Sequence, residues 1–160
     1  MSFDVVVIGS GPAGCTASLY TSRANLKTIQ FEGITPGGQL ITTSIVENFP
    51  GFPDGIDGFE LTERMRSQTK RFGTILVPDT VINIKKNLKN FTIYTNKGEC
   101  ETKSVIIASG SNAKKLSFSG SESFWHKGIS ACAVCDGALP MFRNKPLVVI
   151  GGGDTAMEEA

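Results

Sequence analysis

Two glycine-rich turns, each directly after an apolar run, constrain the fold of this chain more than any other feature. The run at residues 5–8 leads into Gly9-Ser10-Gly11-Pro12-Ala13-Gly14, and the run at 147–150 leads into Gly151-Gly152-Gly153-Asp154-Thr155-Ala156. A short β-branched run is typical of a parallel strand buried on both faces. A Gly-x-Gly-x-x-Gly/Ala turn after such a strand is typical of a dinucleotide site. The two copies predict two nucleotide-binding units rather than a solenoid.

The first turn lies in the context that a dinucleotide site requires. It follows a strand, opens a helix, and is followed by Glu32 at the end of the next predicted strand. Gly9 permits the tight turn, Gly11 lets the backbone approach a pyrophosphate, and Gly14 lets helix and strand pack closely. The helix N-terminus offers N–H donors to phosphates, and the Glu32 carboxylate can accept hydrogen bonds from a ribose. The alternative is a strand–turn–helix without a ligand.

The rest of the chain predicts a mixed α/β arrangement. Residues 35–58 are rich in proline and glycine and predict an irregular, functional loop. A polar stretch at 111–123 is typical of a domain crossing, and the second nucleotide unit is expected to start near Pro146. Helices are expected at 12–23 and 59–72, and strands at 4–8, 27–31, 74–77, 81–85, 91–95, 99–103 and 105–108.

Cys132 and Cys135 form a Cys-x-x-Cys pair between the two turns. Dithiol chemistry needs a lowered thiol pKa because only the thiolate attacks a disulfide, and this spacing is one way to obtain it. Asp136 follows the second cysteine directly. Its carboxylate either transfers protons, if burial raises its pKa, or caps a helix. The sequence leaves both roles open.

The remaining cysteines and the single histidine favour no metal site. A zinc site needs about four ligands, whereas Cys15, Cys100 and His126 are each isolated in the sequence. We expect Cys15 and Cys100 to be small, partly buried residues, and His126 to be a surface or packing residue.

Composition narrows the class of protein. With 40% hydrophobic and 19% charged residues, the chain is typical of a soluble globular protein. Its net charge of +1 favours neither nucleic acid nor an anionic membrane as a partner, and no apolar stretch approaches the roughly 20 residues that span a bilayer. The N-terminus enters a strand without a basic leader, so we expect a cytoplasmic, reducing location. There a close cysteine pair is more often catalytic or metal-binding than structural.

Several segments together resemble the low-molecular-weight NADPH-dependent thioredoxin reductases, over essentially the whole chain. Besides the two turns, they are Gly37-Gly38-Gln39-Leu40, Glu47-Asn48-Phe49-Pro50-Gly51 and the stretch 128–137 around the cysteines. The resemblance implies an α/β, FAD/NAD(P)-binding Rossmann-like fold with two dinucleotide domains. The FAD domain would cover residues 1–112, and residues 113–160 would begin the NADPH domain that carries the dithiol.

The resemblance also implies roles for individual residues. Electrons would pass from NADPH to FAD, then to the Cys132–Cys135 disulfide with Asp136 as acid/base, and then from Cys132 to oxidised thioredoxin. The enzyme would be a homodimer. The residues assigned to FAD are Gly9, Ser10, Gly11, Pro12, Ala13, Gly14, Glu32, Gly38, Gln39, Leu40, Asn48, Val81, Ala108 and Cys135. Those assigned to NADPH are Gly151, Gly152, Gly153, Asp154, Thr155 and Ala156.

The chain departs from the family pattern in two ways. The usual Ala-Thr-Gly at the exit of the first domain is Ala108-Ser109-Gly110 here. Family members are also about twice as long, so we expect an N-terminal fragment that is inactive alone. Two alternatives are a non-catalytic flavin-binding module and a related flavoprotein that reduces another disulfide partner.

Overall fold

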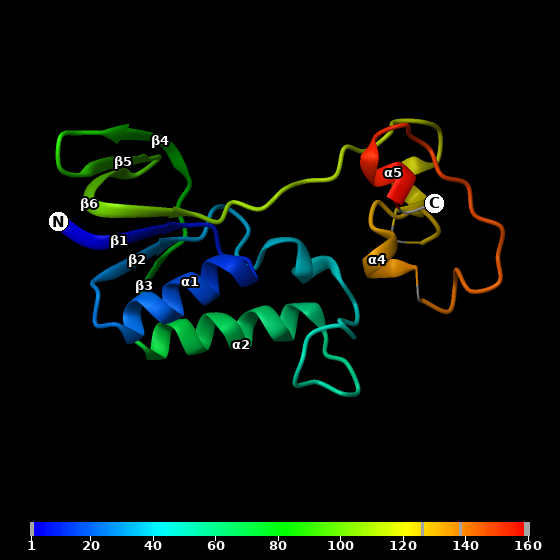
Figure 1. The fold of residues 1–160 in the computed structure, drawn as a ribbon, viewed down its shortest axis with the longest axis horizontal. Helices are drawn as coiled ribbons and strands as arrows, with labels where there is room; N and C mark the ends of the chain where they lie inside the picture. Colours follow the sequence, from blue (N-terminus) through cyan, green and yellow to red (C-terminus); the bar gives the residue numbers. More distant parts are fainter. Residues whose placement is uncertain (1, 126, 138, 159–160) are drawn as a thin grey trace. The chain divides into compact units, whose positions relative to one another are not determined.

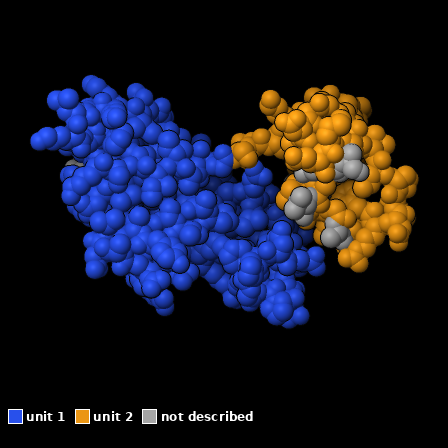
Figure 2. All heavy atoms as spheres, viewed as in Figure 1, with its two compact units in different colours: residues 1–110 blue, residues 111–160 orange. Residues whose placement is uncertain are grey.

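The structure is a computed structural model that describes residues 2–125, 127–137 and 139–158. The chain forms two compact units, Met1–Gly110 and Ser111–Ala160 (Figure 2).

The first unit is built on a six-stranded sheet with the order β3-β2-β1-β6-β5-β4 (Figure 1). β2, β1 and β6 are parallel neighbours and β3 is parallel to β2, whereas β5 and β4 continue the sheet as antiparallel strands. The strands are β1 (Ser2–Ile8), β2 (Thr28–Phe31), β3 (Ile75–Val77), β4 (Val81–Lys86), β5 (Phe91–Thr95) and β6 (Gly98–Ile107).

Two helices lie side by side along the parallel strands (Figure 1). α1 (Pro12–Arg23) begins with a proline, whose fixed φ suits the first helical position. α2 (Gly58–Arg71) is capped by Asp57, whose carboxylate accepts a hydrogen bond from the Glu60 N–H at 2.9 Å. These local signals explain why both helices form close to their predicted ranges.

Apolar side chains of the sheet form the main core. Phe3, Val6, Ile29, Phe31 and Ile93 are buried together and come from three strands, β1, β2 and β5. The cluster therefore connects strands from both ends of the first unit's sequence. This packing holds the carboxyl end of β1, where the first glycine turn begins, in a fixed place in the sheet.

The irregular segment before α2 is more ordered than the sequence predicts. It contains a short 3-10 helix, η1 (Gly38–Thr42), and an isolated bridge between Val46 and Ile56. Both bridge residues are buried with Leu61 of α2 in a second apolar cluster. Burial of apolar side chains therefore fixes the path of this segment, although most of it has no regular secondary structure.

The two strands expected at 99–103 and 105–108 are one continuous strand, so that expectation is wrong. β6 pairs with β1 from Ser2↔Glu101 to Ile8↔Ile107. The hydroxyl of Ser104 also donates to the backbone oxygen of Asp4 at 2.8 Å. Pairing with β1 therefore keeps β6 extended across its polar residues, where the sequence pattern alone predicts a break.

The second unit contains three short helices, α3 (Ser121–Phe124), α4 (Ala133–Asp136) and α5 (Asp154–Glu158) (Figure 1). The strand expected at 147–150 is not formed, and its side chains are exposed, Val148 by 85%. A parallel strand needs neighbouring strands to satisfy its backbone, and the described residues of this unit hold only an isolated bridge between Trp125 and Ile129. Across the described chain, every helix is too short or too polar to span a membrane.

Candidate functional site

The first glycine turn lies where the parallel strands end. The Gly9 N–H donates to the Phe31 oxygen at 2.9 Å, and the Ala108 N–H donates to the Ile8 oxygen at 2.8 Å. Gly9 has a φ of +113°, and a Cβ there would lie 2.1 Å from the Ala108 oxygen. A Cβ on Gly14 would likewise lie 2.1 Å from the Gly9 oxygen. Both positions therefore require glycine, and Ala108 lies directly against the turn.

α1 begins within this turn, and among the described residues the N–H groups of its first turn have no acceptor. The first backbone bond of the helix runs from the Cys15 N–H to the Gly11 oxygen at 3.0 Å. The preceding N–H groups of the first turn, which follow Pro12, are therefore available to an anionic ligand.

Ser10 connects the turn to two other segments. Its hydroxyl donates to the Glu32 backbone oxygen at 2.8 Å and accepts a hydrogen bond from the Gly37 N–H at 3.0 Å. The side chain is buried. The hydroxyl of Ser10 is therefore used to hold three segments of the protein together.

The segment that carries Gly38, Gln39 and Leu40 also reaches the turn. A Cβ on Gly38 would lie 3.2 Å from the Cα of Gly11, so the two backbones nearly touch. The Leu40 oxygen lies against Gly58 at the start of α2. The fold thus brings together segments that the sequence could only assign separately.

Asn48 and Val81 take different positions. Asn48 is exposed in the loop before α2, whereas Val81 packs against the main core at the start of β4. Their predicted contacts with a flavin stay predictions.

Glu32 is paired with a residue that sequence reasoning did not identify. Its carboxylate accepts hydrogen bonds from Arg66 of α2, Nε to Oε1 at 2.7 Å and Nη2 to Oε2 at 3.2 Å. The Glu32 side chain is only 2% exposed. The hydrogen bonds that Arg66 donates to Glu32, and then the one that it donates to Glu63, raise the pKa of Arg66 above its already high usual value. A ribose would have to use the lone pairs that Arg66 leaves on each oxygen.

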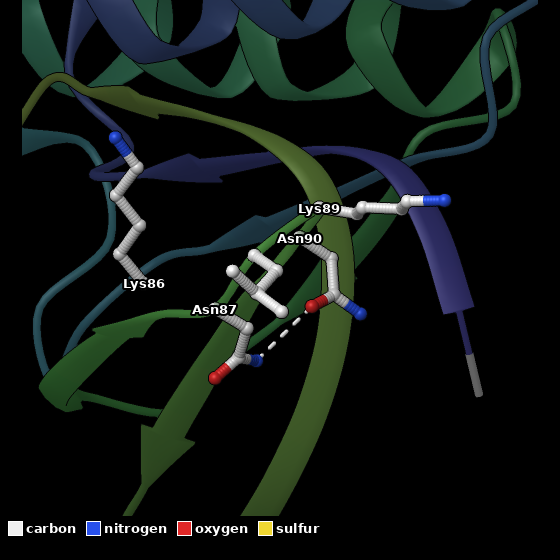
Figure 3. A pocket seen from close by; sticks show the side chains of 5 residues that line it. Lys86, Asn87, Lys89 and Asn90 are labelled. Atoms are coloured by element: carbon white, nitrogen blue, oxygen red, sulfur yellow. Dashed lines mark hydrogen bonds between the residues drawn. The ribbon is translucent and has the colours of Figure 1, made fainter.

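The surface of the first unit has hollows formed by described residues, and two of them are lined by residues other than Cys132, Cys135 and Asp136. One lies at the β4–β5 turn and is lined by residues 86–90, where Asn87 Nδ2 donates to Asn90 Oδ1 at 3.0 Å (Figure 3). The other, about 200 Å³, lies between α1 and α2 and includes Cys15 and Phe52. A single hairpin forms the first hollow, so we assign it no part in the site.

The free cysteines have no features of a reactive thiol. Cys15 is buried and its thiol donates to the Ser10 oxygen at 3.5 Å, whereas Cys100 is half-buried on β6. Burial raises the pKa of both thiols. Both are the packing residues that the sequence predicts, while His126 lies outside the described residues.

Cys132 and Cys135 form a disulfide at the start of α4, with their Cα atoms 5.3 Å apart. Cys132 is the N-cap residue, and its Sγ accepts a hydrogen bond from the Cys135 N–H at 3.2 Å. Since Cys132 occupies the capping position, Asp136 at the end of the helix does not cap it. Of the two roles left open for Asp136, the structure removes helix capping.

The Asp136 carboxylate is instead bound by Ser130, which the sequence reasoning missed. Ser130 Oγ donates to Asp136 Oδ2 at 2.6 Å and accepts a hydrogen bond from the Cys132 N–H at 3.0 Å. A serine two residues before Cys132 is the available sequence signal, because Ser hydroxyls commonly bond the backbone two residues on.

The second glycine turn is formed only locally. Met157 N–H donates to the Gly153 oxygen at 3.2 Å as α5 begins, and a Cβ on Gly151 would lie 3.2 Å from Ala156 Cβ. Residues 147–150, directly before the turn, form no strand, so no sheet fixes the position of the turn relative to a ligand. The NADPH assignment of residues 151–156 therefore stays a prediction.

Comparison with known proteins gives consistent matches. The family described as pyridine nucleotide-disulphide oxidoreductase matches residues 3–160. The chain is 56% identical to thioredoxin reductase 2 of Arabidopsis thaliana, covering 98% of this chain and 43% of that protein. It is 52% identical to thioredoxin reductase 1 of Saccharomyces cerevisiae, covering 98% and 52%.

A solved structure agrees with these matches. The thioredoxin reductase from Streptococcus pyogenes aligns with a TM-score of 0.90 and 42% identity, over 99% of this chain and 51% of that one. The chain spans about half the length of the curated relatives it matches. The FAD/NAD(P)-binding Rossmann-like fold expected from the sequence is confirmed.

Proposed function

The chain belongs to the pyridine nucleotide-disulphide oxidoreductase family, and we propose that the protein that carries it is an NADPH-dependent thioredoxin-disulfide reductase. The observation that carries the proposal is the Cys132–Cys135 disulfide, whose second cysteine is followed directly by Asp136 in the same helical turn. This dithiol occurs in a chain whose first glycine turn is fully formed at the ends of three parallel strands. The thioredoxin reductases that the chain resembles support the choice of substrate.

The first unit is proposed to bind FAD, and its residues fit that group. Gly9 and Gly14 allow the tight packing of the turn against its neighbours, and the first-turn N–H groups of α1 suit a pyrophosphate. The backbone at Gly38 lies next to Gly11 and would form a second side of the site. Glu32 is proposed to accept the ribose hydroxyls. When bound, FAD would supply the electron pair that it receives from NADPH.

The second unit is proposed to carry the disulfide chemistry. Residues 151–156 would bind NADPH, and Cys135 would lie against the flavin. After reduction, the Cys132 thiolate would attack the disulfide of oxidised thioredoxin. Asp136 would hold or release the proton that the leaving thiol needs.

The setting of the enzyme is also a proposal. We place it in the cytoplasm as a homodimer. A reducing location fits a close cysteine pair with a catalytic rather than a structural role. Most soluble oligomers are symmetric dimers, and light scattering on the purified protein measures the assembly directly.

The proposal is tested by an NADPH oxidation assay on the whole protein, purified from the cells that make it. Oxidation of NADPH should depend on added thioredoxin, and Cys135→Ser should abolish it, because one thiol cannot form or open the intramolecular disulfide. Cys100→Ser is the matched control and should keep the activity. Full activity in Cys135→Ser would contradict the proposed mechanism.

A further inference from the structure

We propose that Ser130 is a positioning residue for the carboxylate of Asp136, an inference that rests on the dithiol function proposed above. The hydroxyl lies 2.6 Å from Asp136 Oδ2 and 3.0 Å from the nitrogen of Cys132. A serine hydroxyl has one proton to donate and two lone pairs. It can therefore donate to the carboxylate while it accepts the N–H of Cys132. The Cys132 oxygen, 3.2 Å from the hydroxyl, is a second acceptor for the same proton, and the contact with Asp136 is the shorter of the two. One side chain thus joins the proton-transferring group to the backbone of a reacting cysteine.

The local structure explains why such a link is needed. α4 (Ala133–Asp136) is a single turn, and its backbone bonds include Asp136 N–H to the Cys132 oxygen at 3.0 Å. A helix this short is not stable by itself, because the cost of nucleation exceeds the gain from so few bonds. The hydrogen bonds of Ser130 close a loop from Ser130 to Asp136, and both cysteines lie within this stretch of chain. This loop limits where the carboxylate can lie relative to the disulfide.

Reduction of the Cys132–Cys135 disulfide depends on where the Asp136 carboxyl lies. A thiolate of the reductant attacks one sulfur of the Cys132–Cys135 disulfide, a new S–S bond forms, and the protein S–S bond breaks. Its electron pair remains on the departing sulfur, which takes up a proton from the Asp136 carboxyl. The second thiolate of a dithiol reductant then displaces the mixed disulfide, so the reductant is oxidised. The second protein sulfur leaves as a thiolate and takes its proton from water, and Asp136 regains its own proton from water, so the protein gains two thiols. A carboxyl that is displaced by about 1 Å transfers its proton less well.

The test follows reduction of the disulfide by dithiothreitol, with thiols counted over time. This readout needs neither FAD, NADPH nor thioredoxin. Ser130→Val and Ser130→Thr form the matched pair, since the two side chains have the same shape and only threonine keeps the hydroxyl. Ser130→Val should slow reduction about tenfold, a part of the 10²–10⁴-fold that acid/base catalysis typically contributes. Ser130→Thr should stay within about twofold of the unchanged protein, and Ser123→Ala, in α3, should not differ from it.

A double-mutant cycle separates positioning from a structural role. In an Asp136→Asn background, Ser130→Val should cause no further slowing, because the group that it positions is gone. Equal slowing in both backgrounds, or no difference between the Val and Thr variants, would overturn this inference. If Asp136→Asn itself reacts at the unchanged rate, the acid/base role in the proposed function fails as well. Thioredoxin turnover that persists while the cycle is additive leaves the proposed function standing and removes only the role of Ser130.

Discussion

Two arginines on the same helix show how burial decides what a single ion pair contributes. Arg66 binds a carboxylate that is 2% exposed, whereas Arg64 pairs with Glu60 where both side chains are more than half exposed. Removing one partner of a buried pair leaves an uncompensated charge in a poorly solvated place. An exposed pair loses little, because water replaces the missing partner.

We therefore expect Arg66→Met to lower the free energy of unfolding by about 3 kcal/mol. Arg64→Met should change it by about 0.5 kcal/mol or less. Urea unfolding of the two variants beside the unchanged protein measures both values. Equal losses in the two variants would show that Glu32 does not depend on Arg66 in solution.

The glycine turn allows the same kind of comparison at the scale of a structural element. Gly9 has positive φ and no room for a Cβ, whereas a Cβ on Gly11 would meet only atoms 4.0 Å away. Gly11 also has an extended backbone conformation, with φ −70° and ψ −177°. The fold therefore needs glycine at position 9, while position 11 needs it only for the approach of a ligand.

Gly9→Ala should lower the stability of the first unit by about 3 kcal/mol or more, from strain and a clash with the Ala108 oxygen. Gly11→Ala should keep the unfolding free energy within about 1 kcal/mol but weaken FAD binding at least about tenfold. Thermal unfolding and flavin fluorescence titration separate the two effects. Unchanged FAD affinity in a folded Gly11→Ala protein would argue against pyrophosphate binding at this turn.

On the scale of the whole molecule, the two units carry different parts of the proposed chemistry. The glycine turn that should bind FAD lies in residues 1–110, and the disulfide lies in residues 111–160. A ligand that binds only the folded state stabilises the unit that holds its site. FAD should therefore act on the unfolding of the first unit.

FAD at about 100 times its Kd should raise the stability of the first unit by about 2.7 kcal/mol. Riboflavin is the matched ligand, because it has the isoalloxazine but neither pyrophosphate nor adenosine. Its effect should be much smaller, since it cannot use the turn or Glu32. Calorimetry of the protein with each ligand checks this. An equal effect of both ligands would contradict the proposed mode of binding.

Local sequence signals were sufficient where the physics is local. Pro12 marks the beginning of α1, and the Gly9–Gly14 spacing marks the turn that the structure forms. The Cys132–Cys135 spacing predicted dithiol chemistry, and the structure pairs the two cysteines in a disulfide. A turn, a helix start and a short cysteine loop depend on residues close in sequence, so a single sequence contains the information for them.

Tertiary structure decided everything that depends on distant partners. Pairing with β1 keeps β6 continuous at Ser104. The ion pair of Glu32 with Arg66 joins the end of β2 to α2. Residues 147–150 form no strand, because the described part of their unit offers no neighbouring strand. The hydroxyl of Ser10 is another example, because its partners Glu32 and Gly37 lie on other segments. Such contacts require chain segments to meet in space, and local propensity and spacing do not specify which segments will meet.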